Sequence, residues 1–258
     1  MDDLNSLFRK RIGISANEEI TFETLNYILE QTAQNIPFEN LCIINNKTND
    51  ITRENMTNKI LVKNEGGLCY ELNSILYFFL IENGLNAHLV RGVVYDNVHH
   101  EYVALGRTHV TILLTHEKQT FLVDTGFGGN LPLKPVPLSG ETVTSNNGKF
   151  RIKKVDSEHG DYCLEMKLKH KDTDWKIGYA FDSRELINDV SQFNEIQTII
   201  AEHPKSSFNK NPLITRLTPD GNITLTNSSF TEWHNGTLTK VEIDDPAFKD
   251  LLKKHFGL

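Results

Sequence analysis

The sequence predicts an α+β fold, because three kinds of pattern follow one another along its 258 residues. Apolar residues recur at helical spacing in the first third, and short β-rich segments with turn signals occupy residues 87–181. Both kinds of pattern return after Ser183. We therefore expect an antiparallel sheet or small barrel in the middle, with helices before it and a mixed segment after it.

Two helices are expected in the first third. Ser15 and Glu18 match a capping box, and Thr21 is an alternative cap for the apolar spacing that begins at Phe22. This helix should end before Pro37, because the residue that precedes a proline avoids the α region. The second helix is predicted over residues 69–83, and the glycine at position 84 is a typical C-terminal stop.

The central and final segments are predicted from alternation and turn signals. Strands are expected over residues 88–95, 101–105, 109–115, 120–124, 150–155 and 162–168, and the proline-rich run 131–137 is expected to be extended. Beyond it, the sequence predicts a helix over residues 186–203, strands between 213 and 225 that turn at 219–222, and a short helix over 245–256.

Composition excludes several classes of partner. The formal net charge is −7 and no Lys/Arg-rich run is present, so nucleic acid is not expected as a partner. The longest apolar run, residues 75–81, is too short to span a bilayer, so no membrane partner is expected. The acidic, polar first residues do not resemble a signal peptide, which predicts a cytoplasmic location.

The three cysteines suggest neither a disulfide framework nor a metal site. Cys42, Cys69 and Cys163 are an odd number and lack CxxC spacing, so no bound metal is expected. Cys42 and Cys163 are best interpreted as small buried hydrophobes.

Cys69 has a different setting, because it follows Gly66-Gly67-Leu68 and opens the second predicted helix. Glycine allows the close approach of backbone or substrate. The N-terminus of a helix carries partial positive charge and unpaired N–H groups. A thiol at such a place is more often the nucleophilic thiolate. Cys69 is therefore the candidate nucleophile, and an ordinary buried cysteine is the competing interpretation.

A cysteine nucleophile needs a base and a third group that orients the base. His109 begins a predicted strand that pairs with residues 120–124 through the turn at 116–119. If the turn centres on residues 117–118, paired residue numbers sum to 235 and Asp124 lies opposite Thr111, on the same face as His109. A turn centred on 116–117 puts Asp124 directly opposite His109. An even sum would separate the two, and a His and Asp that both face solvent remain the alternative.

The glycine-rich segment 124–130 follows this hairpin. It lacks the Gly-Lys-Ser/Thr that would indicate a Walker phosphate loop. Three glycines can make a simple turn. If the segment is functional, we expect it to bring backbone close to a ligand.

These motifs together resemble the arylamine N-acetyltransferases. The matching segments occur in the family's order over most of the chain: Pro37-Phe38-Glu39-Asn40-Leu41, residues 66–73 around Cys69, His109-Val110, residues 123–128 around Asp124, Ser206-Ser207-Phe208 and residues 217–221. The resemblance implies a helical bundle over residues 1–86, a β-barrel over 87–183 and an α/β lid over 184–258. Its triad layout is similar to that of papain-like cysteine enzymes and transglutaminases.

The resemblance also implies ping-pong transfer of an acetyl group from acetyl-CoA to an aromatic amine, hydrazine or N-hydroxyarylamine, with roles in xenobiotic metabolism. The implied triad is Cys69, His109 and Asp124, and no tightly bound cofactor is expected. Gly106, Thr108, Gly126 and Gly128 are candidates for backbone contact with CoA. Phe38 and Phe127 are candidates for the wall around the acceptor, with ordinary core phenylalanines as the alternative.

One departure from the family is visible. Glu65 stands where the family usually has an arginine that braces the glutamate at position 39, and Lys63 is a candidate substitute. The alternatives to acetyl transfer are an amide synthase of the same fold that moves a larger acyl group, a cysteine hydrolase, and an inactive binding or sensor protein.

Overall fold

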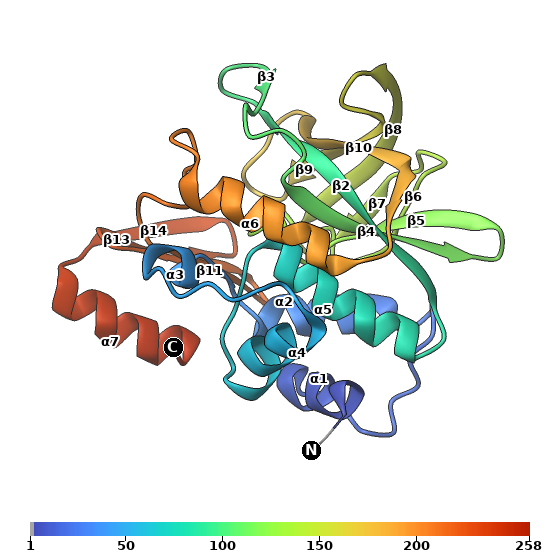
Figure 1. Cartoon of the computed structure of the whole chain (residues 1–258). Helices are drawn as coiled ribbons and strands as arrows, with labels where there is room; N and C mark the ends of the chain where they lie inside the picture. Colours follow the sequence, from blue (N-terminus) through green and yellow to red (C-terminus); the bar gives the residue numbers. More distant parts are fainter. Residues whose placement is uncertain (1–2) are drawn as a thin grey trace.

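The computed structural model describes residues 3–258 and confirms the α+β fold (Figure 1). Six helical segments form the N-terminal part: α1 (Leu4–Ile12), α2 (Leu25–Asn35), α3 (Leu41–Ile44), α4 (Arg53–Met56), the π-helical η1 (Thr57–Val62) and α5 (Cys69–Glu82). α5 is apolar around most of its circumference, as expected of a buried helix. It packs between α1 and α4 on one side and the central strands on the other.

The first helices begin elsewhere than predicted, although α2 ends at Asn35, before Pro37, as predicted. No helix begins at Ser15, because its hydroxyl accepts a hydrogen bond from the N–H of Asn17 and closes a local turn. The hydroxyl of Thr24 likewise accepts from the N–H of Thr21, so the helix begins at Leu25 rather than at position 22. In both places a side chain competes with the backbone for the hydrogen bonds that a helix would need.

The central strands form one nine-stranded antiparallel sheet with the order β6-β5-β4-β2-β10-β9-β8-β7, and β3 pairs with β2 beside this path. β6 also contacts β8, so the sheet curls into a nearly closed barrel (Figure 1). The strands are β2 (Asn86–Asp96), β3 (Glu101–Tyr102), β4 (His109–His116), β5 (Gln119–Val123), β6 (Val136–Pro137), β7 (Val143–Ser145), β8 (Gly148–Ser157), β9 (Gly160–Leu168) and β10 (Lys176–Ile187).

A second, five-stranded antiparallel sheet has the order β1-β11-β12-β13-β14. Its strands are β1 (Phe38–Glu39), β11 (Leu213–Thr218), β12 (Gly221–Thr226), β13 (Ser229–His234) and β14 (Thr237–Glu242). Phe38 pairs with Thr215, so a strand from the N-terminal part completes the C-terminal sheet. This pairing brings a segment of the N-terminal part and the C-terminal sheet together beside the loop that leads into α5. The division of the chain at residues 86 and 183 stays a prediction.

The C-terminal helices are partly as predicted. α7 (Asp245–Phe256) is confirmed, because Asp244 caps its first turn and Gly257 ends it in the left-handed region. The helix predicted from residue 186 begins only at 193, as α6 (Phe193–Glu202) after the short η2 (Val190–Gln192). Leu186 instead pairs with Val90, so β10 continues through the start of the segment for which the sequence predicts a helix. Within residues 3–258 no helix has the length and apolar character needed to cross a membrane.

Candidate active site

Cys69 is the first residue of α5, where the chain is held from two sides. The carboxylate of Glu71 accepts a hydrogen bond of 3.0 Å from the N–H of Leu68, as in a capping box. A Cβ atom on Gly66 would lie 2.2 Å from the carbonyl oxygen of Pro37, so only glycine fits where this loop crosses β1. Cys69 is buried, and its Sγ lies 3.5 Å from the carbonyl oxygen of Thr108. As the first helical residue, it carries an N–H with no acceptor inside the helix.

His109 and Asp124 come from the predicted hairpin, and its register is the one with paired numbers that sum to 235. Ile112 pairs with Val123, so Asp124, one residue beyond β5, lies diagonally across from His109 on the same face. The Nε2 atom of His109 and the Oδ2 atom of Asp124 are 2.8 Å apart, and both side chains are buried. This contact leaves Nδ1 as the ring nitrogen available to the thiol.

The electrostatics of this pair favour an imidazolium beside a carboxylate. Burial alone would lower the pKa of His109, but the charge and hydrogen bond of Asp124, with a smaller contribution from Cys69, raise it to about 10. Burial would raise the pKa of Asp124, but His109 and the hydrogen bonds to the carboxylate hold it below its usual value. The pair is thus arranged to hold a proton on the histidine near neutral pH.

Four donors converge on the Asp124 carboxylate. Besides His109, the hydroxyl of Tyr179 donates to Oδ2 at 2.7 Å. The N–H of Gly126 and the amide of Asn73 donate to Oδ1 at 2.7 and 2.9 Å. Each of these hydrogen bonds favours the charged form of the carboxylate and fixes its plane.

Sequence reasoning missed Asn73 and Tyr179 as supports. Asn73 carries a usable signal, because it follows Cys69 by four residues and so lies on the same face of α5. Its amide also donates to the carbonyl oxygen of Val110 at 2.7 Å, which joins the helix to β4. Nothing in the residues next to Tyr179 indicates this role, because only the pairing of β10 with β2 brings its hydroxyl to Asp124.

A cavity of about 500 Å³ opens over Cys69 and His109. Five further candidates from the sequence line it: Phe38, Thr108, Gly126, Phe127 and Gly128. Gly106 does not, although the neighbouring Ala104 and Leu105 do. The ring of Phe127 meets that of His109 edge to face, at 5.1 Å between centroids. The remaining lining is mostly apolar and includes no aspartate or glutamate.

Position 65 holds a glutamate where the family usually has an arginine, and a lysine elsewhere supplies the positive charge. That lysine is Lys59 rather than the expected Lys63. Lys63 is exposed and forms no ion pair within the described residues 3–258, so it does not take this place. Instead Lys59, from η1, lies 2.6 Å from a carboxylate oxygen of Glu71 and 3.8 Å from one of Glu39. Burial works against the charge of Lys59, but these two glutamates raise its pKa above the usual value. Lys59 therefore balances two buried carboxylates beneath the start of α5.

Removal of the Lys59 ammonium is expected to destabilise the protein. Lys59→Met leaves Glu39 and Glu71 buried without a cation, which costs about 3–5 kcal/mol when one partner of a buried pair is lost. Urea denaturation would measure this as a lower free energy of unfolding. The added exchange Glu65→Arg, which restores a cation beside Glu39, should recover part of the loss. A Lys59→Met protein as stable as the parent would contradict this account.

The other two cysteines lie apart from this site. Cys163 is buried in the barrel, where burial raises the pKa of its thiol to about 11. Burial also raises the pKa of Cys42, which is partly exposed. All three cysteines are free thiols, and residues 3–258 contain no cluster of three potential metal ligands.

Comparison with known proteins agrees with this geometry. A family model described as N-acetyltransferase matches residues 21–258. An uncharacterized acetyltransferase of Bacillus subtilis is 41% identical, over 99% of this chain and 98% of its own length. An arylamine N-acetyltransferase and N-hydroxyarylamine O-acetyltransferase of Salmonella typhimurium is 30% identical, over 86% of this chain and 77% of its own length.

Among solved structures, an arylamine N-acetyltransferase from Bacillus cereus superposes with a TM-score of 0.94 and 42% identity. The match covers 100% of this chain and 99% of the other. That protein is described as having a unique Cys-His-Glu catalytic triad. The residue that contacts His109 in the present chain is the aspartate Asp124.

Proposed function

Since this chain belongs to the arylamine N-acetyltransferase family, we propose that it moves the acetyl group of acetyl-CoA to an aromatic amine through an acetyl-Cys69 intermediate. The observation that carries the proposal is the buried Cys69, His109 and Asp124 at the base of a largely apolar cavity. Acetyl-CoA is the family's donor substrate rather than a bound cofactor.

In the first half-reaction, the Cys69 sulfur, with its proton on His109, attacks the thioester carbonyl. The carbonyl oxygen becomes an oxyanion, and the N–H of Cys69 at the start of α5 is a suitable donor to it. When the intermediate collapses, the carbon–sulfur bond to CoA breaks and His109 returns its proton to the leaving thiolate. Asp124 keeps the ring oriented and stabilises its positive charge throughout.

In the second half-reaction, the acceptor nitrogen attacks acetyl-Cys69. His109 takes a proton from that nitrogen, and the sulfur leaves as the regenerated nucleophile. The cavity favours weakly basic aromatic amines over aliphatic ones. Its lining offers aromatic surface at Phe38, Phe127 and Phe208, and no carboxylate that would pair with an alkylammonium ion.

The remaining assignments follow from this scheme. Thr108, Gly126 and Gly128 line the cavity and are proposed as backbone contacts for CoA, whereas Gly106 would act only through the turn that precedes β4. The absence of nucleic-acid and membrane partners, the role in xenobiotic metabolism and the cytoplasmic location stay predictions.

Intact-protein mass spectrometry after incubation with acetyl-CoA, without amine, tests the proposal directly. We expect a gain of one acetyl group in the parent protein and none in Cys69→Ala. Addition of an arylamine such as 4-aminobenzoate should remove the acetyl group and yield the acetylated amine. Loss of the acetyl group to water alone at the same rate would indicate a hydrolase. The lack of any adduct, with adducts from larger acyl thioesters instead, would favour an amide synthase.

A further inference from the structure

β14 is the free edge of the C-terminal sheet (Figure 1). It pairs with β13 on one side, and within residues 3–258 no strand pairs with its other side. All of its residues are exposed. An exposed strand edge presents N–H and C=O groups that lack a strand partner, so it can act as a template for a further strand.

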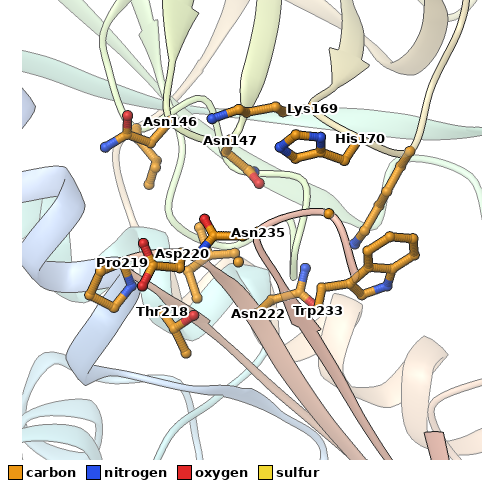
Figure 2. A pocket seen from close by; sticks show the side chains of 15 residues that line it. Asn146, Asn147, Lys169, His170, Thr218, Pro219, Asp220, Asn222, Trp233 and Asn235 are labelled. Atoms are coloured by element: carbon orange, nitrogen blue, oxygen red, sulfur yellow. The ribbon is translucent and has the colours of Figure 1, made fainter. Parts of the chain in front are cut away.

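The turn of the β13–β14 hairpin is fixed against the barrel. Asn235 and Gly236 form this turn with positive φ at both positions, as in the type I′ turn that suits a twisted hairpin. Figure 2 shows Trp233 and Asn235 on the opposite side of a cavity from His170, which belongs to the barrel. The ammonium of Lys171 lies 5.1 Å from the centroid of the Trp233 ring. The hairpin is thus held at its turn, while its outer edge stays open.

Alternate residues of β14 point their backbone groups outward. His234 and Thr237 flank the two-residue turn, so they form a hydrogen-bonded pair. Bonded and non-bonded pairs then alternate along the antiparallel ladder. The N–H of Ile243 donates to the carbonyl oxygen of Ser228 at 3.1 Å, in agreement with this alternation. The N–H and C=O groups of the even-numbered residues 238–242 therefore point away from β13.

The same edge carries apolar side chains that the rest of the sheet does not cover. Leu238 and Val241 are 51% and 52% exposed. Val241 also lines an open groove of about 780 Å³ between β14 and α7, together with Ile243, Ala247 and Leu251. A strand that lies along β14 would therefore cover apolar surface in addition to forming backbone hydrogen bonds.

Symmetry limits how a second copy of this chain can pair with the edge. In an antiparallel two-fold pair, if residue i lies opposite residue j, then j also lies opposite i. An odd sum of the two numbers would make neighbouring pairs equivalent, although neighbours along the ladder differ in kind. Only registers with an even sum are therefore possible.

The charges on the edge distinguish these registers. A sum of 480 places Lys240 opposite Lys240 of the second copy, and a sum of 484 places two copies of Glu242 opposite each other. A sum of 478 gives neither residue a charged partner. A sum of 482 places Lys240 opposite Glu242 twice, with the two copies of Val241 on the axis. Opposite charges across a ladder stabilise it and like charges destabilise it, so the last register is favoured.

We propose that β14 pairs with β14 of a second copy of this chain in the register with the sum 482, so that two C-terminal sheets join into one. Lys240 and Glu242 both direct their backbone groups outward, so each pair of them exchanges N–H···O=C bonds as well as opposite charges. The edge carries one charge of each sign in self-complementary positions. A second copy therefore fits it better than a partner with a single sign of charge.

The proposed interface is small and lies outside the active-site cavity. One short strand and one groove from each copy are at the low end of the size range of protein interfaces, so we expect a dissociation constant in the micromolar range. Variants on this edge should acetylate Cys69 at the parent rate. That rate reports whether each variant is folded, independently of its state of association.

Sedimentation equilibrium from low micromolar to submillimolar concentration tests the pairing. In the register with the sum 482, Lys240→Glu creates two contacts between like charges, and Glu242→Lys does the same. Each variant alone should raise the dissociation constant at least about 10-fold. An equimolar mixture of the two variants regains two contacts between opposite charges, so it should form a heterodimer about as tight as the parent dimer. Lys249→Glu, on α7 outside the groove, is the matched control and should dimerise like the parent.

Hydrogen exchange of backbone amides gives a second readout. At high concentration the N–H groups of Lys240 and Glu242 should exchange more slowly, whereas those of Thr239 and Val241, which face β13, should be unchanged. A parent protein that stays monomeric over the whole range would overturn the proposal. A dimer that neither charge variant weakens would also overturn it, because such a dimer uses another surface. If the mixture of variants fails to associate, the register with the sum 482 is wrong.

Discussion

Replacement of Asp124 by asparagine is expected to slow acetylation of Cys69 by about 10⁴-fold, the scale of the same exchange in a Ser-His-Asp triad. An amide in this place cannot balance the charge of an imidazolium. It also meets four donors, because His109, Tyr179, Asn73 and Gly126 all point hydrogens at the carboxylate. Its NH₂ group must therefore face another donor or force His109 into the wrong tautomer.

Rapid-quench measurement of acetyl-Cys69 formation, with the melting temperature recorded in parallel, separates this effect from unfolding. Tyr179→Phe removes one hydrogen bond to the same carboxylate and should cost only about 1 kcal/mol, or roughly 5-fold in rate. Asp124→Glu should retain more activity than Asp124→Asn, in keeping with the Cys-His-Glu triad described for the Bacillus cereus relative. Acetylation of the Asp124→Asn protein at a rate near that of the parent would remove Asp124 from the mechanism.

The hairpin shows what the sequence predicts well. Strand alternation and a short turn predict that every odd-sum register places His109 and Asp124 on one face, and the structure has one of these registers. The helix at Cys69 is also predicted from its own segment, since the preceding glycines, the apolar run and the stop at Gly84 all agree.

Long-range pairings could not be read in this way. Tyr179 supports Asp124 only because β10 pairs with β2, and Phe38 reaches the cavity only because β1 pairs with β11. The sequence predicts Lys63, which is close to Glu65, as the substitute for the family arginine, whereas the π-helical η1 places Lys59 against Glu71. No pattern within one segment specifies contacts of these kinds.

Gly126→Ala is expected to reduce acetyl transfer by at least 100-fold, because the loop that carries Asp124 rests directly on the start of α5. A Cβ atom at position 126 would lie 2.6 Å from the Cα atom of Cys69 and 2.7 Å from the amide nitrogen of Asn73. The first contact is with backbone, and the second is with a side chain that hydrogen bonds to Val110 and Asp124 hold in place. The loop and the helix must separate, which misplaces the nucleophile from its base, and displacements of about 1 Å cost rates of this order.

The matched control lies three residues further along the same loop. A Cβ atom on Gly129 would meet nothing closer than the Asn222 amide at 3.8 Å, and Gly129 is not among the glycines with positive φ, so Gly129→Ala should keep most of the activity. Acetylation of Cys69 by 4-nitrophenyl acetate is the informative assay, because this small donor lacks the CoA part and so reports on Cys69 and its base. If Gly126→Ala reacts with it as fast as Gly129→Ala does, close contact between this loop and Cys69 is not required for the chemistry. If only Gly126→Ala is slow while both proteins remain folded by circular dichroism, the glycine serves to bring Asp124 and Cys69 within reach of one histidine.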